Sequence, residues 1–328
     1  MSEIKIIEQN INQNKNTIGK EYVDKLDNEN FYNSIKEENA DIYIFNEVIE
    51  PQNIINNLEE LCPDKYEYRF NKKDLTYNSG RMTQNKIMIL YDKRRFTCID
   101  SNEDLYSIED GLDFLHIKLK SNDSDNEYSI IGVRFHNIVD SYNYNQYINY
   151  SKNYSKRELN NLLGKIHESN KKPMTTLQKL MEYVAALENV VMTGDFNNGG
   201  FKSTGYYQCY KYYNYHTIYN FINSMEGNKY KLLTAGVKEN GGKLEYDEAC
   251  WTHLIICDDR LLGKIPYGSP IDHYIISNSL KYKDIKIIED SGIENYAYEV
   301  HDFKDIRKGV EWGRPDHRKV ALVIEDNS

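Results

Sequence analysis

Short apolar runs of strand length recur along most of the 328-residue chain, and they limit the fold more than any other feature of the sequence. Buried β-strands read as apolar runs of roughly 4–8 residues, whereas amphipathic helices need longer segments with a period of about 3.6 residues. The clearest strand-like runs are Ala40–Val48, Lys86–Tyr91, Tyr128–His136, Val190–Thr193 and Ile271–Ser277. Helical spacing is rarer and is clearest in Thr175–Leu187. Many strands with few helices predict an α/β sandwich, although the periodicity also allows a doubly wound sheet.

No internal repeat and no Pro- or Ser-rich linker divides the chain, so a single domain spanning residues 1–328 is the simplest organisation. Two stretches rich in Tyr and Asn interrupt the pattern of strands. They are expected to be insertions in that domain, near residues 142–161 and 199–242. They contain many of the 29 tyrosines of the chain, whose hydroxyl groups must stay hydrated or hydrogen-bonded.

The composition limits the cellular environment and the binding partners that can be expected for this protein. The formal net charge of -10 argues against broad electrostatic adhesion to nucleic acid or anionic lipid, although it allows a local basic groove or a bound cation. The mean hydropathy of -0.74 excludes a membrane-spanning protein, so no membrane partner is expected. The five cysteines contain no CxxC pair and the amino terminus lacks a secretory pattern, so a reduced, cytoplasmic protein is expected.

Polar side chains stand where the predicted strands end. In a layered fold, residues at strand ends gather along one rim, so these side chains are expected to form one pocket. Each of them alone is more simply explained as a turn residue or a structural histidine. The candidates are Asn10, Glu47, His136, Asp195 with Asn197, Asp272, and the pair Asp316-His317 before the last strand.

Several short segments taken together resemble a known superfamily. The most specific are Thr193-Gly-Asp-Phe-Asn197 and Ile271-Asp-His-Tyr-Ile-Ile-Ser277, and Trp251-Thr252 resembles an element that often precedes the second. The others are Ile6–Asn12, Ile44–Val48, Phe135–His136 and Pro315–His317. Their order and approximate spacing are similar to those of the endonuclease/exonuclease/phosphatase superfamily. It includes DNase I-like nucleases, abasic-site endonucleases, deadenylases, inositol-phosphate phosphatases and sphingomyelinases.

The resemblance implies a four-layer α/β sandwich, in which two mixed sheets are flanked by helices and the active site lies at one edge. It also implies a Mg²⁺ or Mn²⁺ cofactor, with Glu47 as the main carboxylate ligand, Asn10 beside it, and Asp316 completing the metal region. Asn12 is an alternative to Asn10, because the family usually has an aromatic residue where Gln9 stands. Oxygen ligands with room for water are what hard divalent cations require.

The resemblance also implies catalytic roles for five residues. Asp195 would orient or deprotonate the attacking water, and Asn197 would donate a hydrogen bond to a phosphoryl oxygen. His317 would contact the scissile phosphate while Asp272 fixes its tautomer, and His136 would assist protonation of the leaving oxygen. These roles suit phosphate ester hydrolysis. A cation, imidazoles and an amide donor stabilise the charge that develops on the phosphoryl oxygens, and a carboxylate takes the proton of water.

Substrate contacts are expected at the rim of the site, from Arg81, Asn85, Arg134 and Arg314. The chain lacks the Arg and Trp signatures of the inositol-phosphate phosphatases, and His136 favours DNase I-like cleavage. The sequence therefore predicts a metal-dependent nuclease acting on nucleic acid, with DNA and RNA both open, and it does not predict the oligomeric state. Two alternatives stay open. One is a phosphatase or phosphodiesterase acting on a small nucleotide, an inositol phosphate or a sphingolipid headgroup, and the other is a non-catalytic member that only binds phosphate.

Overall fold

The structure is a computed structural model of the whole chain. It describes residues 2–11, 28–72, 75–76, 82–83, 86–104, 112–135, 175–196, 215–225, 227, 229–240, 243–246, 252–259, 263–269, 271–288 and 317–326.

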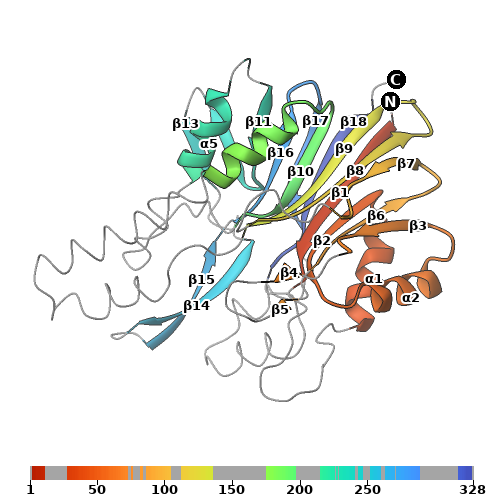
Figure 1. The fold of residues 1–328 in the computed structure, drawn as a ribbon. Coiled ribbons are helices and arrows are strands. Elements are labelled where there is room, and N and C mark those ends of the chain that lie inside the picture. Colours follow the sequence, from red (N-terminus) through yellow and green to blue (C-terminus); the bar gives the residue numbers. More distant parts are fainter. Residues whose placement is uncertain are drawn as a thin grey trace, which may run out of the picture.

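Two mixed sheets of six strands each lie face to face (Figure 1). Across the first sheet the strands are β17 (Tyr282–Ile287), β18 (Val320–Asp326), β1 (Ser2–Asn10), β2 (Ile42–Val48), β6 (Lys86–Asp92) and β3 (Tyr66–Phe70). Across the second they are β11 (Tyr230–Leu233), β16 (Asp272–Ser277), β10 (Val190–Asp195), β9 (Glu127–Phe135), β8 (Leu112–Ser121) and β7 (Phe96–Ser101). The central pair of each sheet is parallel, β1 with β2 and β9 with β10, while the outer pairs are antiparallel.

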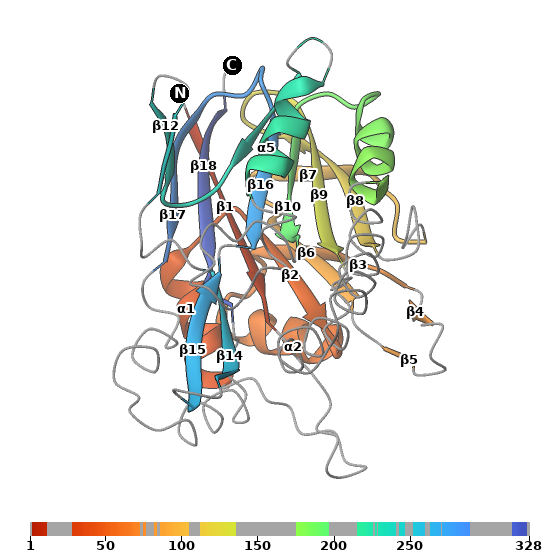
Figure 2. The same cartoon turned by 90° about the vertical axis from the view of Figure 1, so that its left-hand side faces the viewer.

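Helices cover the outer faces of both sheets, as Figure 2 shows from the side. α1 (Asn28–Glu38) and α2 (Pro51–Leu61) pack on the first sheet through a shared apolar cluster. A helix at residues 175–184 and α5 (Tyr215–Ser224) pack on the second sheet. The apolar face expected for Thr175–Leu187 is buried there. The arrangement is helix, sheet, sheet, helix, so the four-layer sandwich is confirmed.

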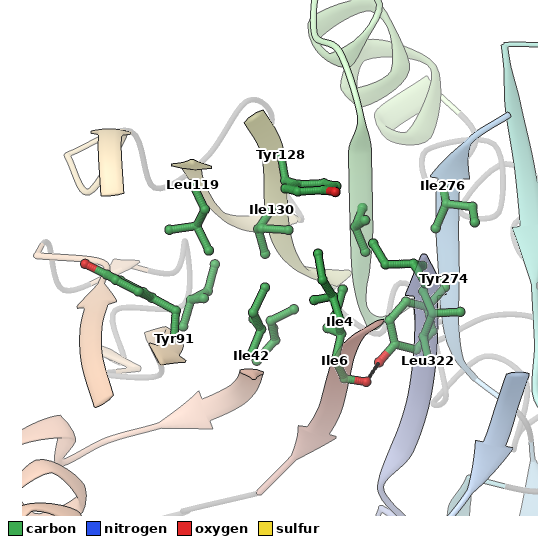
Figure 3. Packing of buried hydrophobic residues seen from close by; sticks show 14 of the residues in the cluster. Ile4, Ile6, Ile42, Tyr91, Leu119, Tyr128, Ile130, Tyr274, Ile276 and Leu322 are labelled. Carbon is green, nitrogen blue, oxygen red and sulfur yellow. Dashed lines mark hydrogen bonds between the residues drawn. The ribbon is translucent and has the colours of Figure 1, made fainter. Parts of the chain in front are cut away.

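Alternation of side chains along the strands builds the interior between the sheets. On β1, Ile4 and Ile6 point between the sheets, whereas Ile7 points toward the helical layer. Figure 3 shows Ile4 and Ile6 facing side chains of the second sheet. The buried hydroxyl group of Tyr274, on β16, lies 2.9 Å from the carbonyl oxygen of Val320 and 3.2 Å from that of Ile6. A side chain of the second sheet is therefore hydrogen-bonded to the backbone of the first.

Three two-stranded pairs stand beside the sandwich in the described part of the chain. They are β4 (Leu75–Thr76) with β5 (Met82–Thr83), β12 (Val237–Asn240) with β13 (Lys243–Tyr246), and β14 (His253–Asp259) with β15 (Gly263–Ser269). None of the helices that the structure describes is both long enough and apolar enough to cross a membrane.

The two expected insertions fall differently on the structure. Residues 142–161 lie outside the described residues. Within 199–242, α5 buries Ile218 and Ile222 against the second sheet, and β11 forms the edge strand beside β16. Part of this stretch therefore belongs to the sandwich itself. The organisation as a single domain with insertions stays a prediction.

Candidate active site

Strand directions bring the polar strand ends to one edge of the sandwich. β1 runs parallel to β2, and β9 runs parallel to β10, so the carboxyl ends within each pair lie at the same edge. β18 and β16 run antiparallel to these strands and begin at that edge. Asn10, Glu47 and Asp195 therefore lie near Asp272 and His317, although these residues come from distant parts of the chain.

The amide group of Asn10 joins the two sheets at this edge. Its Nδ2 lies 3.1 Å from Oδ2 of Asp195, on β10, and 3.3 Å from Oε1 of Glu47, on β2. All three side chains are buried. Because Nδ2 faces the carboxylates, the role of metal ligand predicted for Asn10 would fall to Oδ1. The structure thus brings together three of the predicted site residues.

Glu47 lies on a β-bulge with a left-handed backbone. The register between β2 and β6 shifts between Phe45 and Val48, so that two residues of β2 oppose one residue of β6. The φ angle of Glu47 is +56°, a region that costs a residue with a Cβ roughly 1–2 kcal/mol. Bulges next to active sites redirect side chains, and strain of this kind persists where the surrounding structure imposes it. Sequence reasoning found Glu47 but could not find the bulge that directs it.

The guanidinium group of Arg134, on β9, lies between two carboxylates. Its Nε and Nη2 lie 2.8 Å and 2.5 Å from Oε1 of Glu47. Its Nη1 lies 3.2 Å from Oδ2 of Asp113, which is opposite Arg134 on β8. Sequence reasoning named Arg134 as a substrate contact and missed Asp113, which lies in an apolar run outside every motif. A contact of Arg134 with substrate stays a prediction.

Asp272 and His317 form a buried acid–histidine pair. Nδ1 of His317 lies 2.9 Å from Oδ2 and 3.1 Å from Oδ1 of Asp272. The side chain of His317 is 4% exposed and that of Asp272 is 0% exposed. The carboxylate accepts the hydrogen of Nδ1, which fixes the ring and directs proton exchange with a substrate to Nε2. The structure therefore brings this predicted pair together, and its catalytic role stays a prediction.

Neighbouring polar side chains hold this pair in place. Oγ1 of Thr252 accepts hydrogen bonds from the backbone N–H groups of Ile271 and Asp272, at 3.0 Å and 3.2 Å. Nε2 of Gln9 donates to the carbonyl oxygen of His317 at 3.0 Å. Thr252 belongs to the Trp-Thr element noted in the sequence. Gln9, for which sequence reasoning had no role, fixes the segment that carries the histidine.

Position 194, just before Asp195, requires a glycine because the backbone of the adjacent strand β9 lies very close to it. The φ angle of Gly194 is +151°, and a Cβ there would lie 1.8 Å from the carbonyl oxygen of Val133, on the adjacent strand β9. A residue with a side chain would push the two strands apart at the position where Asp195 leaves the sheet. This explains physically why a glycine precedes the acid in this motif.

A second acid, Glu8, lies behind the site and was not predicted. It is fully buried, and its Oε1 accepts a hydrogen bond from Nδ2 of Asn46 at 3.0 Å. Its Oε2 has no hydrogen-bond partner among the described residues. Burial raises the pKa of Glu8 well above its usual value, the charge of Asp272 raises it further, and His317 opposes the shift. Burial therefore shifts the protonation equilibrium of Glu8 toward the neutral acid. Its only signal in the sequence is an acid inside an apolar strand.

The described side chains at this edge carry more negative than positive charge. Five buried carboxyl groups lie there: Glu8, Glu47, Asp113, Asp195 and Asp272. The guanidinium of Arg134 and the buried histidines His273 and His317 lie among them, and the buried Arg318 follows His317. Carboxylate and amide oxygens are the ligands that Mg²⁺ and Mn²⁺ prefer, so the donor chemistry fits the predicted cofactor. Within the described ranges, however, no three His, Cys, Asp or Glu side chains are placed to hold a metal ion together.

The remaining predicted site residues lie outside the described residues. They are His136, Asn197, Asp316, Arg81, Asn85 and Arg314, together with the alternative ligand Asn12. The aromatic rings of Phe135 and Phe196, next in sequence to the first two, stack with their centroids 5.2 Å apart. The roles of these site residues stay predictions.

Comparison with known proteins identifies the fold. No protein-family model matches the chain, and no curated protein matches it. A Bacteroides vulgatus structure described as an endonuclease/exonuclease/phosphatase is 13% identical, covers 99% of each chain and has a TM-score of 0.50. D. rerio TDP2, solved with a single-strand DNA product, is 10% identical over 99% of this chain and 100% of its own, with a TM-score of 0.53. ANGEL2, described as a 2′,3′-cyclic phosphatase, is 12% identical over 98% of this chain and 95% of its own, also with a TM-score of 0.53.

These likenesses extend over nearly the whole chain. At such low identity they show the fold, which is the DNase I-like sandwich of the endonuclease/exonuclease/phosphatase proteins. The resemblance drawn from the sequence motifs is therefore confirmed at the level of the fold. Activity has to be argued from the site.

Proposed function

We propose that the protein is a divalent-metal-dependent phosphodiesterase and that it acts as a DNase I-like nuclease on DNA or RNA. The observation that carries the proposal is the convergence of predicted site residues at one edge. There, Asn10 bridges Glu47 and Asp195 next to the pair of Asp272 and His317. Ionisable groups are costly to bury and gather where chemistry is carried out, so such a cluster supports a catalytic site.

In this proposal, each described residue has one task. Glu47 and Asn10 hold the divalent cation, which when bound supplies a Lewis acid for the phosphoryl oxygens. Asp195, fixed by the amide group of Asn10, orients the attacking water and accepts its proton. His317, oriented by Asp272, presents Nε2 to the phosphate and stabilises the charge that develops there.

Three residues outside the described ranges complete the scheme by resemblance. Asp316 joins the metal region, Asn197 donates a hydrogen bond to a phosphoryl oxygen, and His136 protonates the leaving oxygen. Asn85 lies where the family often has a polar partner for that histidine. Arg81, Arg134 and Arg314 are the candidate contacts to the phosphates of the substrate.

The fold alone does not choose the substrate. TDP2 was solved with a single-strand DNA product, whereas ANGEL2 is described as a 2′,3′-cyclic phosphatase, so the same architecture serves polymers and small esters. His136 and the absence of inositol-phosphatase signatures favour a nuclease. The second candidate is hydrolysis of a small phosphate ester. It is favoured by the net charge of -10, because a small ester needs fewer phosphate contacts than a polyanion does.

A substrate panel separates these candidates. Single- and double-stranded DNA, RNA, 2′,3′-cyclic nucleotides, inositol phosphates and sphingomyelin are each incubated with Mg²⁺, with Mn²⁺ and with EDTA. The proposal expects cleavage of a nucleic acid that depends on metal and stops with EDTA. Cleavage of a small ester only favours the second candidate. A titration that shows no Mg²⁺ or Mn²⁺ binding, together with no turnover, would favour the non-catalytic alternative.

The Asp195→Asn variant tests the mechanism. Loss of the carboxylate that handles the proton of water should lower kcat by about 100- to 10,000-fold. Asp284→Asn is the matched control, because this carboxylate is exposed on β17 and should leave kcat unchanged. Turnover of Asp195→Asn at the wild-type rate would refute the proposed mechanism.

A further inference from the structure

The proposed metal carboxylate needs support that its own strand does not provide. Glu47 lies on a bulge, with a φ angle of +56° and two residues of β2 opposite one of β6. Regular pairing with β6 therefore does not fix the direction of its side chain. A carboxylate that binds a cation must nevertheless be held in place, since ligand orientation contributes strongly to metal affinity.

Arg134 provides such support from the opposite sheet. Two nitrogens of its guanidinium group, Nε and Nη2, lie 2.8 Å and 2.5 Å from the same oxygen of Glu47. Nδ2 of Asn10 approaches this oxygen, Oε1, as well. A planar guanidinium that meets a carboxylate through two nitrogens fixes direction as well as charge, which a lysine cannot do.

Asp113 in turn fixes Arg134. It pairs with Arg134 across β8 and β9, and its Oδ2 lies 3.2 Å from Nη1. The side chains of Glu47, Arg134 and Asp113 are 10%, 15% and 2% exposed, so water screens their interaction only weakly. The three side chains form a clamp from β2 to β9 and β8, across both sheets.

Stability alone is a weak reason for this clamp. Buried ion pairs often contribute little compared with apolar residues of similar size, because their desolvation offsets their attraction. The clamp is also placed at the edge where the candidate site lies. We infer that Arg134 is a positioning residue for the metal carboxylate Glu47, and that Asp113 acts on Glu47 through Arg134. The inference deepens the proposed function and rests on it.

Binding of Mn²⁺, measured by calorimetry and by electron paramagnetic resonance, tests the inference without any substrate. Arg134→Lys keeps the charge but loses the two-point contact, so it should weaken Mn²⁺ binding by about 10-fold or more. Lys118→Met is the control, because it breaks an exposed ion pair with Glu127 on the same two strands. It should leave Mn²⁺ affinity unchanged, and urea unfolding checks that every variant is folded.

A double-mutant cycle tests the part assigned to Asp113. The effect of Asp113→Ala on Mn²⁺ affinity is measured in the wild type and in Arg134→Met. Because both measurements contain the direct effect of losing the charge of Asp113, their comparison cancels it. If Asp113 acts through Arg134, its replacement should weaken Mn²⁺ binding at least about fivefold more in the wild type than in Arg134→Met. Should Arg134→Met not fold, Arg134→Lys takes its place in the cycle.

Two results would overturn the inference alone: unchanged Mn²⁺ affinity in Arg134→Lys, or equal effects of Asp113→Ala in both backgrounds. No Mn²⁺ binding by the wild type would overturn both the inference and the proposed metal-dependent function. Failure of the proposed hydrolysis alone gives a different result. In that case the cycle shows coupling between Asp113 and Arg134, but no phosphate ester is hydrolysed.

Discussion

Replacement of Asp272 by Asn tests whether the acid–histidine pair takes part in chemistry. Asn has nearly the same shape, and the backbone N–H of position 272 can stay bonded to Thr252, so the fold should be retained. With Nδ1 of His317 2.9 Å from Oδ2, the two charge centres are separated by about 4 Å. At an effective dielectric constant of about 20, an imidazolium and a carboxylate at this distance attract each other by about 4 kcal/mol. If this attraction acts mainly in the transition state, its loss should lower kcat by about 1,000-fold.

Steady-state kinetics on the best substrate of the panel, at saturating Mg²⁺, provide the measurement. KM should change little, because the pair orients a ring rather than filling a binding pocket. Asp326→Asn is the matched control. Asp326 is also a buried carboxylate, bonded to Ser121 and Tyr128 at 2.8 Å each, but it lies at the far end of β18. This control should lose stability and keep kcat. A loss in Asp272→Asn below about tenfold, or an equal loss in both variants, would refute the reasoning.

Two further predictions concern stability. Burial lowers the pKa of His116 to about 4, from a usual value of 6.5. The unfolded chain therefore binds the proton more tightly, and the free energy of unfolding should fall as the pH drops through this window, by about 2 kcal/mol at pH 5. His116→Gln should remove that part of the pH dependence in urea titrations, and equal slopes for both proteins would contradict it. Gly194→Ala places a Cβ 1.8 Å from the carbonyl oxygen of Val133. It should lose about 3 kcal/mol or more in urea unfolding, and an unchanged urea midpoint would count against the packing argument.

Much of the fold was predictable because local patterns determine it. Runs such as Ala40–Val48 and Val190–Thr193 are apolar on both faces, as strands covered by a second sheet on one side and by helices on the other must be. The helical period in Thr175–Leu187 identified one covering helix. Periodicity could not distinguish a sandwich from a doubly wound sheet, because that choice depends on which strands pair. The order of the motifs resembles that of the endonuclease/exonuclease/phosphatase superfamily, and this resemblance favoured the sandwich.

The site was predictable only where a motif marked it. Asp195 and Asp272 lie at the strand ends where the sequence placed them. The bulge at Glu47 left no such mark, because it arises from the pairing of β2 with β6. The contact of Arg134 with Asp113 and Glu47 depends on which strands pair and on how the two sheets pack. Neither is encoded in the spacing of residues along one strand.

Charge compensation within the site also follows from packing. Five carboxyl groups are buried at the candidate site, and for two of them, Glu8 and Asp272, the cost of burying a charge is offset in different ways. Burial raises the pKa of Glu8 well above its usual value, so this acid can avoid carrying a charge. Asp272 keeps a partner instead, since Nδ1 of His317 lies 2.9 Å from its Oδ2. The carboxyl groups of Glu8 and Asp272 are both fully buried, and neither needs a bound cation to offset the cost of its burial.

Arg134 pairs with two of the other three carboxyl groups. The guanidinium of Arg134 lies against both Glu47 and Asp113, and Asp195 is held by the neutral amide of Asn10. The carboxylates of Glu47 and Asp195 therefore meet at the amide of Asn10, and the resemblance implies that Glu47 and Asn10, with Asp316, hold a divalent ion. A bound cation there would turn an anionic pocket into one that attracts phosphate. On this argument, a net charge of -10 does not prevent the protein from acting on phosphate esters, because the local balance at the edge decides what can bind.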